Sequence, residues 1–215
     1  MNLPLWVLRA VLAAAGLAVW FWTQALIARR GFPQGQIGDR LLDLTASLNR
    51  LLWEHPRLAD GVLIVTSAVI DLIGIFLVVL GVFGSSIRPL VGLLFLFALR
   101  QVCQGLCALP APERMIWRYP GFPSLLVTYG TASDLFFSGH TAIAVYGSIE
   151  LAHVGGPLVV LLGLAIVLVE ATAVLVLRAH YTMDVFTGAV TALWVWTVAS
   201  ALAPGLDRSL ASMLG

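Results

Sequence analysis

Long runs of apolar residues constrain this chain more than any other feature of its sequence. Of its 215 residues, 60% are hydrophobic and 11% are charged, and the mean hydropathy is +0.98, well outside the range of water-soluble domains. A helix needs about 20 apolar residues to cross a bilayer. We therefore expect an all-α integral membrane protein, with residues 1–215 forming one domain, a bundle of six transmembrane helices. The expected spans are about 3–28, 58–83, 87–108, 139–154, 157–177 and 181–202.

Two of these runs differ from an ordinary span. The first is too long, and has too few basic residues at its front, for a signal peptide, so we expect it to be a transmembrane helix. The fourth, 139–154, is short and relies on its polar ends.

The charged residues restrict the partners and the location. A net charge of +1 argues against a nucleic-acid partner. All 12 basic residues are arginine, and the chain is rich in Ala, Gly, Leu and Val, a composition typical of a GC-rich bacterial genome. We expect a multi-pass protein of a bacterial inner membrane, and the sequence permits a homo-oligomer.

Cys103 and Cys107 lie four residues apart, a spacing that suits helix packing better than a disulfide.

The polar stretch between the first two spans contains an amphipathic pattern. Apolar residues recur there at helical spacing, with charged residues largely on the other faces. This pattern predicts an interfacial helix over about 36–54, lying in the membrane surface as a structural collar or, alternatively, as a substrate gate. The apolar residues are Ile37, Leu41, Leu44, Leu48 and Leu51.

The second and third expected spans form a helical hairpin, and two opposite charges are expected at the same depth within it. Its turn is the sequence Gly84-Ser85-Ser86, and counting outward from it places Asp71 and Arg100 at the same level. We expect these two residues to pair. The pair is either structural, or Asp71 positions Arg100 to contact a phosphate.

A connection rich in Pro and Gly follows the third span. Because its polar backbone cannot face lipid, we expect it to fold over the protein at the membrane surface, beside His140. The connection before His180 is very short, so both histidines should emerge on the same side of the membrane.

Two short motifs, 138–141 and 180–184, place potentially reactive histidine and aspartate side chains at the ends of apolar segments. His180 and Asp184 are four residues apart at the start of a helix, within hydrogen-bond range of each other. A carboxylate bonded to one ring nitrogen makes the other nitrogen more nucleophilic. Ser138 and Gly139 precede His140, so the backbone N–H groups of a helix N-terminus should favour a phosphate there. Together these groups predict a phosphoryl-transfer site that needs no metal and no other cofactor.

Other interpretations of the histidines remain open at this point. Each could be a core residue with a structural hydrogen bond, and the two histidines with a carboxylate could bind zinc. His55 and His153 lack comparable surroundings.

The two motifs resemble those of the lipid phosphatase/phosphotransferase superfamily, the type-2 phosphatidic acid phosphatases and their relatives. The stretches 134–141 and 180–185 are most similar to the sphingomyelin synthases and to the plant phosphatidylcholine:diacylglycerol cholinephosphotransferases. Arg100 lies nine residues before the sequence Leu109-Pro110-Ala111-Pro112, and this arrangement is also similar to both of these families. The resemblance covers about residues 58–205 and implies a bundle of six spans.

Departures from the phosphatase pattern indicate the substrate. The chain has no lysine, Phe137 stands where the pattern has Pro, and Val174 stands where it has Arg. The absent cations would bind a doubly charged terminal phosphate, so a singly charged diester is the expected substrate. The synthase pattern is also incomplete, because Ala132-Ser133 replaces its Cys-Gly.

The resemblance also implies a role for each motif residue. His180 attacks phosphorus, Asp184 orients His180, and His140 protonates the departing diacylglycerol oxygen and then deprotonates the acceptor alcohol. Glu150 and Glu170, within expected spans, are predicted to pack helices or to contact a cationic head group. The expected substrate contacts are Asp134, Ser138, Gly139, Arg100 and Tyr181.

We therefore expect a head-group phosphotransferase. It would move a phosphoryl-alcohol, such as phosphocholine or phosphoethanolamine, from a membrane phospholipid donor to a lipid-alcohol acceptor, diacylglycerol or ceramide, through a phosphohistidine. The alternatives are a phosphatase or phospholipase C-type hydrolase on the same scaffold, and a lipid-binding or transport protein without turnover.

Two arguments about orientation conflict. The positive-inside rule favours a cytoplasmic active site, because most arginines lie on that side, whereas the family resemblance implies a periplasmic site. We follow the resemblance. The arginines expected on the active-site side are Arg29, Arg30, Arg40, Arg50, Arg57, Arg114 and Arg118, against Arg9, Arg88 and Arg208 on the other.

Overall fold

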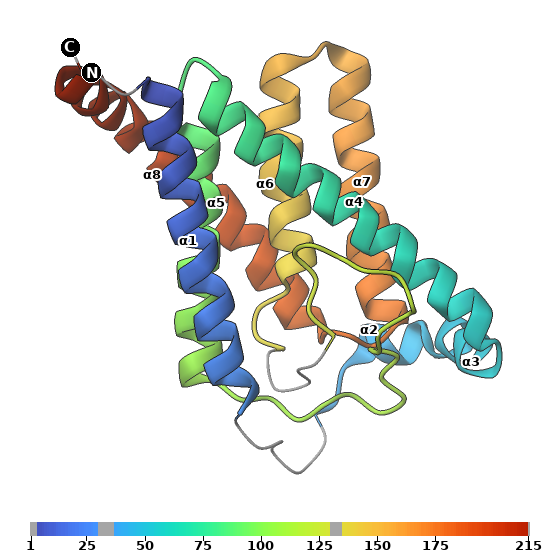
Figure 1. Cartoon of the computed structure of the whole chain (residues 1–215). Helices are drawn as coiled ribbons and strands as arrows, with labels where there is room; N and C mark the ends of the chain where they lie inside the picture. Colours follow the sequence, from blue (N-terminus) through green and yellow to red (C-terminus); the bar gives the residue numbers. More distant parts are fainter. Residues whose placement is uncertain (1–3, 30–36, 130–134, 215) are drawn as a thin grey trace.

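The computed structural model describes residues 4–29, 37–129 and 135–214, and every regular element in these ranges is a helix. Figure 1 shows the helices with their labels, and the long ones gather into one bundle. The elements are α1 (Leu5–Ala28), α2 (Arg40–Leu44), α3 (Ala46–Glu54), α4 (Pro56–Phe83), α5 (Arg88–Leu106), α6 (Gly139–Val154), α7 (Pro157–Val176) and α8 (Thr182–Leu214).

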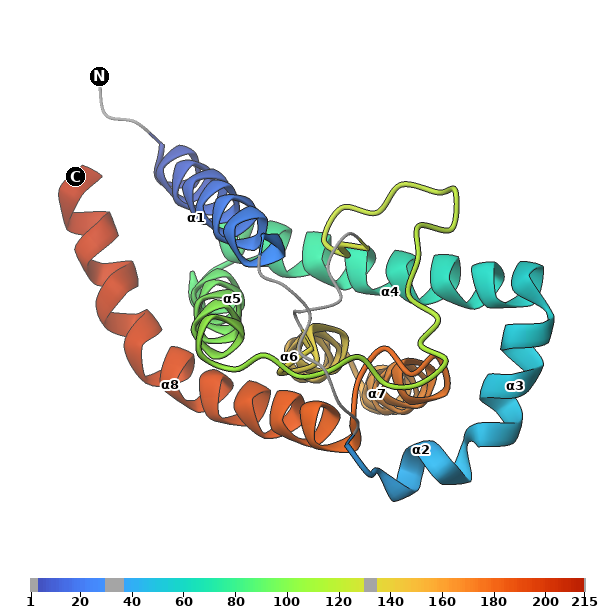
Figure 2. The same ribbon diagram turned by 90° about the horizontal axis from the view of Figure 1, so that it is seen from below.

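Five of the expected spans are confirmed as helices long and apolar enough to cross a membrane, namely α1, α4, α5, α7 and α8. The sixth, α6, forms at the expected residues but has only 16 of them, so the count of six spans is not confirmed. It packs against α4, α5, α7 and α8, which surround it in Figure 2. A helix enclosed by protein has no lipid contact that would fix its length.

The ends of the spans differ modestly from expectation. Helix α8 continues to Leu214, past the expected end at 202, although Pro204 lies inside it. The extension brings Asp207 to Arg9 of α1, where two of their side-chain atoms lie 2.7 Å apart. Asp207 also accepts hydrogen bonds from the backbone N–H of Ile87 and the hydroxyl of Ser86. This cluster fastens α1, the α4–α5 turn and α8 together.

The single helix expected over 36–54 is instead two short helices, because the backbone breaks at Thr45. Asp39 caps α2 by accepting hydrogen bonds from the N–H groups of Leu41 and Leu42. Asn49 of α3 is fully buried and donates to the carbonyls of Arg114 and Val176, so polar contacts fix this segment to the protein. The five periodic apolar side chains are all at least 42% exposed. Their contact with a membrane surface remains a prediction.

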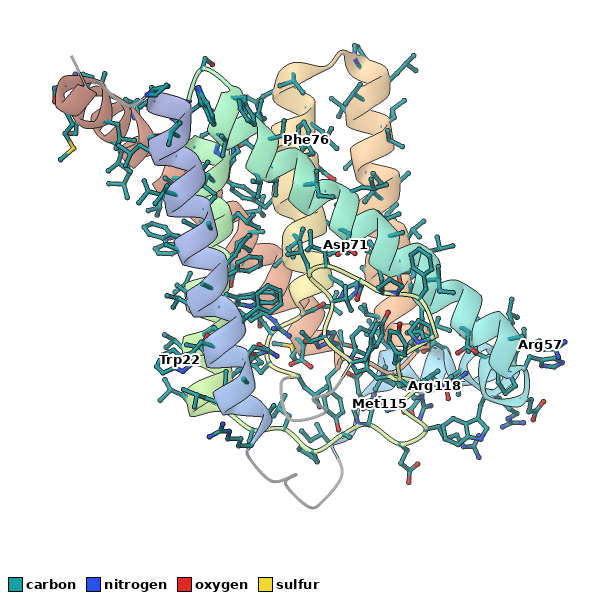
Figure 3. The ribbon with its side chains drawn as sticks, in the orientation of Figure 1. Trp22, Arg57, Asp71, Phe76, Met115 and Arg118 are labelled. Carbon is teal, nitrogen blue, oxygen red and sulfur yellow. The ribbon has the colours of Figure 1, made fainter. Side chains whose placement is uncertain are left out.

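The expected pair of Asp71 with Arg100 is wrong. The carboxylate of Asp71 accepts hydrogen bonds from the backbone N–H groups of Leu125 and Leu126. Helix α4 crosses the bundle at a steep tilt to α5 (Figure 1), so equal counts from their shared turn do not lead to neighbouring places. Figure 3 shows Asp71 where the segment between α5 and α6 crosses α4.

The two acidic residues within expected spans have different environments. Glu150 is fully buried and binds Arg88 through two hydrogen bonds, of 2.9 and 2.8 Å. Glu170 is also fully buried, and its carboxylate oxygens have no hydrogen-bond partner among the described residues. Helix packing, one of the two expected roles, therefore fits Glu150.

Replacing Asp207 with Ala should lower the free energy of unfolding by about 3 kcal/mol, because it leaves a buried guanidinium without its carboxylate. The Arg9 side chain is 5% exposed. A matched control is Asp60→Ala, which removes the pair with Arg118, 45% exposed; its cost should be below about 1 kcal/mol. Unfolding of the purified protein in detergent measures both, and equal costs would contradict the assignment.

Asp39 also joins α2 to the start of α8, since its two carboxylate oxygens accept hydrogen bonds from the N–H and the hydroxyl of Thr182, each at 2.6 Å. Desolvation by burial would raise the Asp39 pKa, but these bonds and those from Leu41 and Leu42 hold that pKa below its ordinary value. A carboxyl whose folded-state pKa is depressed stabilises the fold above its unfolded-state pKa, about 4, and loses that effect as pH falls through the folded-state pKa.

Thermal unfolding between pH 2 and pH 7 should therefore show a loss of stability at acid pH that is smaller in Asp39→Asn. The matched variant Asp43→Asn, exposed on α2, should keep the wild-type pH profile. Identical profiles for wild type and Asp39→Asn would refute the role of this carboxylate.

Candidate active site

A cavity at one end of α6 contains both motif histidines. Its described lining includes Arg100 of α5, Gly139 and His140 of α6, and His180, which lies just before α8. The remaining described wall is largely apolar and aromatic, and comes from α1, α4, α5, α6, the segment between α5 and α6, and Ala179. Both histidines therefore lie at the same end of the helix bundle, and their position on one side of the membrane remains a prediction.

A backbone carbonyl holds the ring of His180. Its Nδ1 lies 2.7 Å from the carbonyl oxygen of Leu135. A carbonyl only accepts, so Nδ1 carries the proton and donates it, and Nε2 keeps its lone pair. The side chain is buried, 5% exposed. His180 is therefore fixed in the tautomer that a nucleophile or base requires.

Asp184 does not form the hydrogen bond with His180 that its spacing predicted. Its Oδ2 accepts a hydrogen bond from the N–H of Tyr181 at 2.8 Å and lies 3.7 Å from Nδ1 of His180. The reason is local: Asp184 is the third residue of α8, where an acidic side chain turns back to cap the helix. Asp184 is fully buried, and no described residue bonds its Oδ1. Its carboxylate is therefore close to the His180 ring without a hydrogen bond to it.

His140 is the second residue of α6 and is 6% exposed. The Ser138 hydroxyl caps this helix by accepting from the N–H of Thr141 at 3.3 Å, so Ser138 is used in capping and is not among the described lining of the cavity. The Nε2 of His140 has no hydrogen-bond partner among the described residues. Trp117 packs edge-on against the ring, with centroids 5.4 Å apart.

Arg100 and Gly139 meet at the wall of the cavity. The Nε of Arg100 donates to the carbonyl of Phe137 at 3.2 Å, and a Cβ on Gly139 would lie 3.0 Å from that Nε. The missing side chain thus lets the guanidinium approach the N-terminus of α6. A cation beside the N-terminus of a helix favours a bound anion such as a phosphoryl group.

The other expected substrate contacts differ. The Tyr181 side chain is 4% exposed and its hydroxyl donates to the carbonyl of Pro110 at 3.0 Å, which ties the start of α8 to the preceding segment. Tyr181 is absent from the described lining of the histidine cavity. Asp134 lies outside the described residues.

Sequence reasoning missed four contributors to the site: the Leu135 carbonyl and the rings of Trp20, Phe97 and Trp117. Every residue has a carbonyl, so no sequence signal marks that of Leu135. Trp20 lies in the first span, far from both motifs, and that span also contains Trp6 and Trp22, so no sequence signal marks it.

Among the described residues, no group of three His, Cys, Asp or Glu side chains is placed to hold a metal ion. The anion-stabilising groups that the described part of the cavity offers are Arg100 and the N-terminus of α6.

Comparison with known proteins identifies a family. No curated protein and no solved structure matches the chain. A family model described as AtPDCT1/2, the phosphatidylcholine:diacylglycerol cholinephosphotransferases, matches residues 39–201, from the α2 cap into α8. The likeness to sphingomyelin synthases and to the wider phosphatase superfamily remains a prediction. The chain belongs to the AtPDCT1/2 family.

Proposed function

We propose that this protein moves phosphocholine from phosphatidylcholine to diacylglycerol within the membrane, through a phosphohistidine at His180. The AtPDCT1/2 family is an enzyme family of this activity, with those two lipids as its substrates. The observation that carries the mechanism is the bond from Nδ1 of His180 to the Leu135 carbonyl. That bond leaves Nε2 as the nucleophile, in a cavity shared with His140 and Arg100.

In the first half-reaction, Nε2 of His180 attacks phosphorus and the bond from phosphorus to the diacylglycerol oxygen breaks. His140 enters this step as the imidazolium and gives one ring proton to that oxygen, so neutral diacylglycerol departs, His140 becomes neutral and choline stays on the phosphoryl group. The ring of His180 gains positive charge as the P–N bond forms. The carboxylate of Asp184, 3.7 Å from Nδ1, stabilises that charge.

In the second half-reaction, the hydroxyl oxygen of another diacylglycerol attacks phosphorus while His140 takes the hydroxyl proton. The P–N bond breaks, and His180 returns to its starting state. Arg100 and the N–H groups at the start of α6 stabilise the phosphoryl oxygens in both steps. A single described cation in the cavity wall suits the single charge of a diester.

The burial of both histidines supports transfer over hydrolysis. His140 is 6% and His180 5% exposed, beneath the segment between α5 and α6. A covered site limits the access of water to a reactive phosphohistidine. Ceramide in place of diacylglycerol is a second acceptor that the same chemistry allows.

His180→Ala should abolish transfer, with a loss of about 10³-fold or more, because the covalent route requires its Nε2. The assay follows label from [methyl-¹⁴C]choline phosphatidylcholine to added diacylglycerol carrying distinct acyl chains, in proteoliposomes. His153→Ala, exposed at the other end of α6, is the matched control and should be unaffected. Alkaline quenching should trap labelled protein in the wild type and none in His180→Ala. Full activity of His180→Ala would refute the mechanism.

Asp184→Asn tests charge separately from helix capping. The amide oxygen of Asn can still accept the N–H of Tyr181, so the cap persists while the negative charge is lost. We expect kcat to fall by about 1000-fold at unchanged KM, because an interaction of about 4 kcal/mol between unit charges 4 Å apart at intermediate dielectric is removed only as the His180 ring becomes positive. Unchanged kcat would exclude an electrostatic role for Asp184.

A further inference from the structure

Helix α1 contributes to the active site although it lies outside the segment matched to the family, 39–201. Most of its side chains are exposed or half-buried, but Trp20 is 4% exposed and lines the cavity of the two histidines. α1 packs against α4 and α5, as Figure 2 shows from the site end. Trp20 is therefore the residue through which α1 takes part in the cavity.

Trp20 is held by its ring. It stacks on Phe97 of α5, with centroids 4.8 Å apart and an interplanar angle of 17°. Its indole N–H is buried and has no hydrogen-bond partner among the described residues, whereas a buried tryptophan usually finds one. A ring fixed in this way offers π surface rather than a hydrogen bond.

Trp117 is a second fixed ring in the same wall. Its indole N–H donates to the carbonyl of Thr128 at 3.1 Å. One turn after Trp20, Gln24 accepts a hydrogen bond from Gln101 at 2.9 Å and donates to the Thr128 hydroxyl at 3.4 Å. The segment that carries Trp117 and the helix that carries Trp20 are thereby joined, and both rings keep their places in the cavity.

The described wall of the cavity contains one group of polar side chains and one group of aromatic side chains. Its polar side chains include Arg100, His140 and His180, which suit the phosphoryl group, and its aromatic residues are Trp20, Phe97, Trp117 and Phe137. No Asp or Glu is among the described lining residues. A quaternary ammonium has no N–H to donate and binds well to aromatic faces, tryptophan best of all.

We propose that Trp20, together with Trp117, determines donor specificity by holding the trimethylammonium end of the head group while the phosphoryl group lies at the histidines. The proposal rests on the proposed function, because it takes the donor to be a choline phospholipid.

The test compares two donors in the same full-length protein, reconstituted in liposomes. One is phosphatidylcholine, and the other is its 3,3-dimethylbutyl analogue, in which carbon replaces nitrogen and the head group is the same shape without the positive charge. Trp20→Leu should lower kcat/KM for phosphatidylcholine by about tenfold, mainly through KM, and should change that for the neutral analogue less than about twofold. Trp20→Phe should give an intermediate ratio.

Trp22→Leu is the matched control, because Trp22 is on the same helix, is 64% exposed and points away from the bundle in Figure 3. It should leave the ratio between donors unchanged. That ratio does not depend on the amount of folded protein, and Trp20→Phe still decides the matter if Trp20→Leu is inactive.

An equal loss for both donors in the Trp20 variants, or no loss for either, would overturn the proposal while the proposed function stands. If the wild type transfers neither head group to diacylglycerol, the proposed function is wrong and the assignment of Trp20 fails with it.

Discussion

Two hydrogen bonds between the segment before α6 and the start of α8 hold the site together. The Leu135 carbonyl accepts from Nδ1 of His180 at 2.7 Å, and the N–H of Ser138 donates to the Asp184 carbonyl at 3.0 Å. Gly188 allows this approach, because a Cβ there would lie 2.6 Å from the Ser138 carbonyl oxygen. The two histidines, 40 positions apart in the chain, share one cavity through these contacts.

The described parts of the segment between α5 and α6 line the cavity and are fastened to neighbouring helices at several points. Asp71 of α4 accepts hydrogen bonds from two backbone N–H groups of the segment. The N–H of Ile116 donates to the Leu177 carbonyl at 2.7 Å, and the Asn49 side chain donates to the Arg114 carbonyl. Each bond satisfies backbone groups that lipid could not satisfy. An irregular segment can therefore cover a site in a membrane protein without forming a helix.

Arginine side chains join helices at one end of the bundle and also line the cavity at the other. Away from the site, Arg9 pairs with Asp207 and Arg88 with Glu150, so cations there fix helices. At the site, Arg100 lines the cavity beside the N-terminus of α6 and bonds a backbone carbonyl. Buried ion pairs hold helices together, and an arginine in the wall of a cavity can in addition bind an anionic substrate.

The order of amino acids alone predicts the class of protein, the positions of the long helices and the two motifs. Apolar length and the order of residues near a helix start are local properties, so they can be read from the chain. The folded structure was needed to show that other helices pack around α6 and that Trp20 reaches the cavity. It was also needed to show that Asp71 binds backbone N–H groups rather than Arg100, and that the Leu135 carbonyl rather than Asp184 holds the His180 ring. These depend on helix tilt and on backbone carbonyls, which every residue has, and no local pattern encodes them.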